Sequence, residues 1–309
     1  MSSLLINEIL TNCTYTDKIL ESFIWPIDSL PDLERIEAVN ILIEACNVRG
    51  SEENRDKLSP GVRALLWDRC IPLLRQISEN GLHKNEPGLK ALHALCRLLS
   101  SCLALLCDSG EVEKLTMITL PVFQNLEGED CTQSKGQFDI DVAVEVLAVL
   151  LPSLTSDLEL LVKLTSCILS AVKVLSDDRV SKILVRVLFT LLNCVNDRSR
   201  TDILQRLWLD LCTWHESEKN MTVTARTLLC LIAVSDYLFT PSEMSLLHDR
   251  HNYLSDPRLS QSFWVIIQSG LTHRDNVARK RALYLLKKCV ALSEAENMEF
   301  LASSDGGEM

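Results

Sequence analysis

The stretch HRDNVARKRALYLLKKCV, His273–Val290, decides the fold assignment of this chain. It holds six Lys and Arg side chains and one Asp, in a chain whose formal net charge is −11. At about 100° per residue, its apolar side chains share one continuous arc of a helical wheel: Ala278, Ala282, Leu283, Leu285, Leu286, Cys289 and Val290. The stretch is therefore predicted to be an amphipathic helix with a buried stripe and a basic outer face.

The first half of this helix resembles the second helix of a HEAT repeat, in which Asp, Val, Arg, Ala and Leu recur at set offsets. Asp275 is expected to cap the helix or to pair with an arginine of a neighbouring repeat. Ala282 is small enough to let the adjacent helix approach closely. Arg279 lies within the apolar arc, which favours a structural arginine paired between repeats over a ligand contact.

The outer face of the helix is the candidate contact surface for RNA or another partner. The residues predicted to make that contact are Arg274, Lys280, Arg281, Tyr284, Lys287 and Lys288, with His273 beside them at the edge. Two interpretations remain open: a solvated face of a repeat helix, or a patch that contacts phosphates. The negative net charge of the chain argues against non-specific nucleic-acid binding by the whole surface, so any contact with phosphates is expected to be local.

Elsewhere, apolar residues recur at spacings of three and four, which indicates one amphipathic helix after another. The predicted helices cover residues 3–12, 16–24, 32–48, 60–79, 88–108, 111–125, 138–151, 155–175, 178–195, 198–215, 219–237, 241–253, 257–270 and 276–293. Ser59 and Pro60 are expected at one helix start, and Asp256 and Pro257 at another.

The fold class predicted from this pattern is all-α, an α-α superhelix of HEAT- or armadillo-like antiparallel helix hairpins. Helices that start near 138, 178, 219 and 276 recur at about 40–57 residues, close to the period of those repeats. One array is expected over residues 1–293, interrupted by a mobile loop at about 126–137. Residues 294–309 are expected to form an acidic, flexible tail.

The twelve cysteines are spread evenly and mostly lie in apolar runs, which favours reduced core residues over a disulfide framework. The first residues lack the pattern of a signal peptide. The most apolar segment, 89–107, contains Lys90, His93 and Arg97, so no membrane-spanning helix is expected. A cytoplasmic or nuclear location is predicted.

No constellation in the sequence predicts chemistry: no catalytic residue, no cofactor site and no metal site is expected. His248 and His251 share a helical face, but no further ligand lies nearby in sequence. Cys96 and Cys107 share a face at about 16 Å along a helix axis, too far apart for a disulfide or a common metal.

The segment DPRLSQSFWVIIQSGLTHRDNVARKRALYLLKK, within residues 254–292, resembles the helical N-terminal region of the eukaryotic tRNA guanosine 2′-O-methyltransferase family. That family is also called the TAR RNA-binding protein 1 family, and its catalytic domain is of the SpoU type. The glycine-rich S-adenosylmethionine loops and the Asn/Arg pair of that domain do not occur in these 309 residues, so no catalytic residue carries over. The resemblance implies a helical scaffold that helps to hold tRNA or supports the enzyme's architecture.

Two functions are therefore predicted. The first is a non-catalytic helical-repeat scaffold that binds protein or RNA, with a link to tRNA modification. The alternative is a short form or fragment of that methyltransferase which lacks the active site. Whether the chain takes part in an enzyme stays open at this point.

Overall fold

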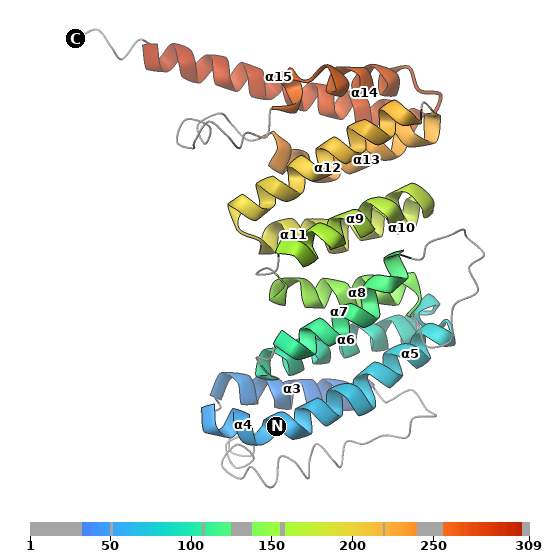
Figure 1. The fold of residues 1–309 in the computed structure, drawn as a ribbon, viewed down its shortest axis with the longest axis vertical. Helices are drawn as coiled ribbons and strands as arrows, with labels where there is room; N and C mark the ends of the chain where they lie inside the picture. Colours follow the sequence, from blue (N-terminus) through green and yellow to red (C-terminus); the bar gives the residue numbers. More distant parts are fainter. Residues whose placement is uncertain are drawn as a thin grey trace. The chain divides into compact units, whose positions relative to one another are not determined.

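A computed structural model describes residues 33–49, 52–106, 109–124, 138–154, 158–218, 220–239 and 256–304 of the chain. Helices account for 91% of these residues and none of them lies in a strand (Figure 1), so the all-α prediction is confirmed for this part. The predicted helices at 3–12, 16–24 and 241–253, and the predicted loop at 126–137, lie outside the described residues.

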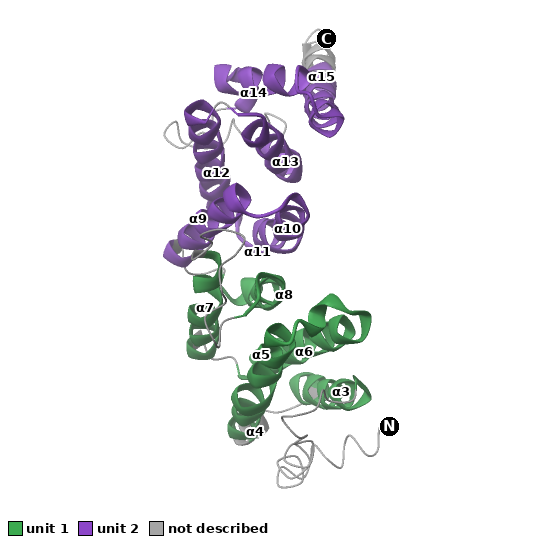
Figure 2. Cartoon of the chain, turned by 90° about the vertical axis from the view of Figure 1, so that its right-hand side faces the viewer, with its two compact units in different colours: residues 1–156 green, residues 157–309 purple. Residues whose placement is uncertain are grey.

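The chain divides into two compact units, residues 1–156 and 157–309 (Figure 2). The first unit contains α3 (Leu33–Arg49), α4 (Glu52–Leu65), the π-turn η1 (Leu66–Cys70), α5 (Ile71–Glu79), the 3₁₀ turn η2 (Leu82–Lys84), α6 (Glu86–Leu106), α7 (Ser109–Gln124), α8 (Ile140–Leu150) and the 3₁₀ turn η3 (Leu151–Ser153). The long helix α6 packs against α3, α4, α5 and α8 and buries much of its surface.

The second unit contains α9 (Leu158–Val174), α10 (Asp177–Ile183), the π-turn η4 (Leu184–Leu188), α11 (Phe189–Cys194), α12 (Asp197–Ser217), α13 (Met221–Leu238), the 3₁₀ turn η6 (Pro257–Leu259), α14 (Gln261–Leu271) and α15 (Asn276–Ser304). These helices form two layers (Figure 2). One layer holds α9, α12 and α14, and the other holds α10, α11, α13 and α15. Across the layers, α9 contacts α10, α12 contacts α13 and α14 contacts α15.

Close approach between successive hairpins of the second unit depends on small side chains. A Cβ atom built on Gly270 of α14 would lie 2.6 Å from Leu228 Cδ1 and 2.7 Å from Ala282 Cβ. Such distances are shorter than real carbon contacts, so only glycine fits there. The expected role of Ala282 at a close helix contact agrees with this packing.

Two helices extend well beyond their predicted bounds. The helix predicted from residue 60 starts at Glu52, so Pro60 lies inside α4 and not at a helix start. Leu58 is buried on the same face as Val62, and this burial favours continuing the helix upstream despite the missing proline N–H. α15 continues to Ser304 beyond its predicted end near 293, into the segment expected to be a tail.

Two described helices, α6 and α13, are long and apolar enough to cross a bilayer by length and composition alone. About half of each apolar window is already buried against other helices of the chain, 56% for α6 and 50% for α13. Core helices of proteins without any membrane contact meet the same criterion, so this is weak evidence for a span.

The described cysteines are thiols, and all of them except Cys194 are buried, as the apolar runs around them predict. Burial raises the pKa of Cys70, Cys212 and Cys230 to about 12, because a thiolate is poorly solvated in an apolar interior. These thiols are therefore protonated at neutral pH and act as small apolar side chains.

Candidate functional site

The start of α15 is fixed by the side chains of the loop before it. Asp275 caps the helix: its Oδ1 accepts the Val277 N–H at 3.0 Å and its Oδ2 accepts the Ala278 N–H at 3.3 Å. The hydrogen bond from Val277 is the main reason that the pKa of Asp275 is lowered from 3.8. The capping role expected for Asp275 is confirmed.

His273 is buried, and therefore lies beneath the candidate contact surface and not at its edge. Its Nδ1 accepts the Asp275 N–H at 3.0 Å, so the proton of the neutral ring is on Nε2. Nε2 lies 2.9 Å from the carbonyl oxygen of Met221 and donates to it. His273 thus ties the loop before α15 to the start of α13.

Arg279 is structural, as predicted, but its partners differ from those expected. Its Nη1 donates to the carbonyl oxygens of His273 and Arg274, at 2.6 and 2.7 Å. Both acceptors belong to the loop of the same hairpin and not to a neighbouring hairpin. Arg279 therefore holds the α14–α15 connection in shape.

Two of the six predicted contact residues, Arg281 and Lys288, face α13. Arg281 Nη1 donates to the carbonyl oxygen of Ala225 at 3.3 Å. Lys288 Nζ donates to the Ser235 hydroxyl at 3.0 Å and forms an ion pair with Asp236. Both side chains therefore join successive hairpins. The prediction placed them on one basic outer face of the helix, whereas the structure places them against α13.

The other four predicted contact residues are exposed. Arg274 lies in the loop, whereas Lys280, Tyr284 and Lys287 follow one another at one-turn spacing along α15. Half of the surface of Tyr284 is exposed, at 50%. The structure thus brings together an aromatic ring between two lysines on the solvent side of α15.

Apolar residues share this solvent side, contrary to the predicted buried arc. Leu283 is 43% exposed and Val290 is 50% exposed, whereas Ala278, Ala282, Leu285 and Cys289 are buried as predicted. The predicted arc was too wide, because α15 contacts α13 and α14 over a narrower stripe. We define the outer face of α15 as Lys280, Leu283, Tyr284, Lys287 and Val290.

A pocket of about 630 Å³ lies between α12, α13 and α14, and His215 and His273 contribute to its wall. His215 Nε2 lies 3.2 Å from the Thr224 hydroxyl. Burial lowers the pKa of His215 from 6.5, and the nearby Glu216 carboxylate opposes this only in part. The pocket is lined mainly by groups that already bond to one another, such as Ser262 with Glu216.

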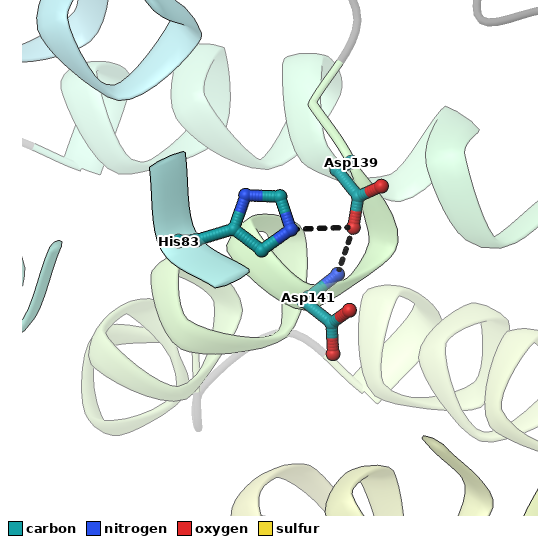
Figure 3. A group of neighbouring side chains, drawn as sticks. All are labelled: His83, Asp139 and Asp141. Atoms are coloured by element: carbon teal, nitrogen blue, oxygen red, sulfur yellow. Dashed lines mark hydrogen bonds and ion pairs between the residues drawn. The ribbon is translucent and has the colours of Figure 1, made fainter. Parts of the chain in front are cut away.

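His83, Asp139 and Asp141 gather in the first unit, with candidate ligand atoms within 4.8 Å of one another (Figure 3). The left-handed conformation of Gly81, with φ of 61°, turns the chain from α5 into η2 and so places His83. His83 Nε2 lies 3.5 Å from Asp139 Oδ1, a distance that fits an ion pair and is long for a hydrogen bond. No sequence motif predicts this group, because His83 and Asp139 are far apart along the chain.

Helix capping accounts for the two carboxylates of this group. Asp139 is the N-cap of α8, its Oδ1 accepts the Asp141 N–H at 2.9 Å, and its own N–H donates to the Ser78 hydroxyl. Asp141 lies in the first turn, where a negative charge is favoured by the helix dipole and a cation is not. The group therefore serves the start of α8 and does not argue for a bound metal. His248 and His251 lie outside the described residues.

No family model, no curated protein and no solved structure matches this chain. The resemblance to the tRNA methyltransferase family thus stays a prediction. The site that emerges from the geometry is the outer face of α15.

Proposed function

We propose that this chain is a non-catalytic scaffold of stacked helical hairpins, of the HEAT or armadillo type, that binds a protein partner through the outer face of α15. The observation that carries the proposal is a repeated contact in the second unit. A basic residue at the same place in successive hairpins reaches back to the hairpin before it.

The two copies of this contact are alike in position. α13 is capped by Asn220 and α15 by Asp275, and the sixth residue after each cap is an arginine. Arg226 donates to the carbonyl oxygens of Val172 and Lys173 at the end of α9, at 3.0 and 2.7 Å. Arg281 donates to Ala225 of α13. The acceptors lie at different places, because Val172 and Lys173 end the first helix of their hairpin and Ala225 lies near the start of the second helix of its own. What recurs is an arginine at one position that bonds to the backbone of the preceding hairpin, and contacts between neighbouring units hold repeat arrays together, whose role is to present extended surfaces to partners.

A protein partner is favoured by the composition of the outer face. Exposed Leu283 and Val290 lie beside Tyr284, and aromatic and apolar side chains are enriched at the centres of protein interfaces. The lysines at positions 280 and 287 supply a polar rim. Arg281 and Lys288 are engaged with α13, and Arg279 is bonded to the loop before α15, so these three residues contribute little to a phosphate-binding surface.

RNA is the second candidate, on the ground that Tyr284 is flanked by Lys280 and Lys287 with Arg274 exposed nearby. An aromatic ring can stack on an RNA base while the basic side chains around it contact the phosphates. tRNA is the RNA to test first, because of the resemblance to the tRNA methyltransferase family. In that case this chain, which lacks the catalytic residues of that family, would hold RNA for the methylation reaction.

The experiment is site-specific photo-crosslinking in cells. p-Benzoylphenylalanine replaces Tyr284 in one variant and Phe189 in a matched control, because Phe189 of α11 is 45% exposed in the same unit. We expect a discrete adduct at 284 that is absent at 189. An adduct that ribonuclease leaves unchanged and that yields peptides of a second protein by mass spectrometry means a protein partner, and an adduct that ribonuclease shortens means RNA. Equal labelling at both positions, or none, contradicts the proposed function.

A further inference from the structure

α13 and α15 occupy equivalent places in successive hairpins, so their residues can be compared by counting from the caps Asn220 and Asp275. The eighth residue after the cap is Leu228 in α13 and Leu283 in α15. The fifteenth is Ser235 in α13 and Val290 in α15. At both places the residue of α15 is apolar.

The two helices differ in what covers these places. Leu228 is fully buried and Ser235 is 1% exposed, because the α14–α15 hairpin packs over them through Gly270 and Lys288. Leu283 and Val290 are 43% and 50% exposed. On α13 these two positions contact the next hairpin. On α15 the equivalent positions, Leu283 and Val290, are exposed.

The two helices also differ in charge beside these positions. The fifth and twelfth residues after the cap are Ala225 and Ile232 in α13, but Lys280 and Lys287 in α15. The lysines lie one turn on either side of Tyr284 and flank Leu283. A helix that packs on α15 as α14–α15 packs on α13 thus meets two positive charges that the internal interface lacks.

We propose that the outer face of α15 binds an α-helix of another protein, one with small residues against Leu283 and with acidic residues opposite Lys280 and Lys287. This inference rests on the proposed function and names the class of partner. Two observations support it: the surface continues the geometry of an interface already present in the chain, and its charges require an acidic counterpart. Helix-in-groove recognition uses anchors at this spacing of three, four and seven residues.

The test uses the full chain and a probe of defined chemistry. The probe is a fluorescent, hydrocarbon-stapled helix of about five turns, with alanines along one stripe and glutamates on both sides. A matched control probe carries lysines in place of the glutamates. Binding is measured by fluorescence anisotropy at low and at physiological salt.

We expect the acidic helix to bind and the basic helix not to bind. The double variant Leu283→Asp/Val290→Asp should weaken binding roughly tenfold or more, since two apolar anchors are lost. Val185→Asp in η4 is the control, because Val185 is 63% exposed but lies away from this face. Lys280→Ala/Lys287→Ala should weaken binding and flatten its dependence on salt. Circular dichroism of each variant separates loss of binding from loss of folding.

Three results overturn the inference: no binding of the acidic helix, equal binding of both probes, or full binding by the folded double variant. A ribonuclease-resistant adduct at position 284 that contains a second protein would then leave the scaffold function standing with a different kind of protein partner. A ribonuclease-sensitive adduct would replace the helix with RNA. Absence of any adduct specific to 284 would remove the proposed function itself.

Discussion

Leu228 of α13 is fully buried, whereas Leu283, at the same place counted from the cap of α15, exposes 43% of its surface. The difference predicts unequal costs for the same substitution. Leu228→Ala should lower the free energy of unfolding by about 2–5 kcal/mol, because it leaves a cavity beneath Gly270 and Ala282. Leu283→Ala should change it by no more than about 0.5 kcal/mol. Urea denaturation of both variants measures the contrast, and similar costs would mean that Leu283 is covered in the folded protein.

Gly270→Ala tests the close contacts that Gly270 of α14 makes with α13 and α15. Alanine favours a helix over glycine by about 1 kcal/mol, which alone would stabilise α14. The added Cβ would lie 2.7 Å from Ala282 Cβ, and this atom cannot rotate away as Leu228 Cδ1 can. Overpacking of this kind costs about 1–3 kcal/mol, so we expect net destabilisation in a thermal melt. The double variant with Ala282→Gly should recover part of the loss, and a stabilised single variant would contradict the packing described.

Arg281 and Lys280 are neighbours in sequence, but Arg281 contacts α13 and Lys280 is exposed on the outer face. Substituting each one therefore distinguishes a residue that stabilises the fold from one that is available to bind a partner. Arg281→Ala removes the hydrogen bond to Ala225 and should cost about 0.5–1.5 kcal/mol. Lys280→Ala should leave stability within about 0.5 kcal/mol, because the side chain is exposed. Denaturation curves for the two single variants are the measurement. Equal stability of both would place Arg281 on the outer face with Lys280, as the sequence alone predicted.

The period of the apolar residues was sufficient to predict the all-α character and most of the helices of the described residues. The stripe Ala278, Ala282, Leu285 and Cys289 is buried as expected, because a period of 3.6 residues is a local property of the chain. The group that Arg281 or Lys288 binds, in contrast, depends on residues far away in the sequence. Lys288 faces α13 because Asp236, far away in sequence, lies opposite it, and no helical wheel contains that information. Leu283 is apolar without being buried for a related reason: burial depends on which hairpin packs next.

His215 makes the stability of the second unit depend on pH. Its folded pKa is lowered from 6.5, so the unfolded chain binds a proton more readily than the folded chain. Stability should therefore be at its full value above pH 6.5 and fall as the pH drops below 6.5 toward the folded pKa. His215→Gln removes this titration and should flatten the change between pH 7 and pH 5, measured by urea denaturation at each pH. An unchanged slope in the variant would assign the pH dependence to another group.

Asp139 distinguishes helix capping from metal binding at His83. Asp139→Ala removes the acceptor for the Asp141 N–H and the partner of buried His83, and should cost about 1–3 kcal/mol. Asp139→Asn keeps an acceptor oxygen at the cap and should cost less. Added Zn²⁺ should leave the melting temperature of the unmodified chain unchanged, because the positive end of α8 disfavours a cation there. A rise in melting temperature with Zn²⁺ that His83→Ala abolishes would show that the three side chains bind a metal, and that the capping account is incomplete.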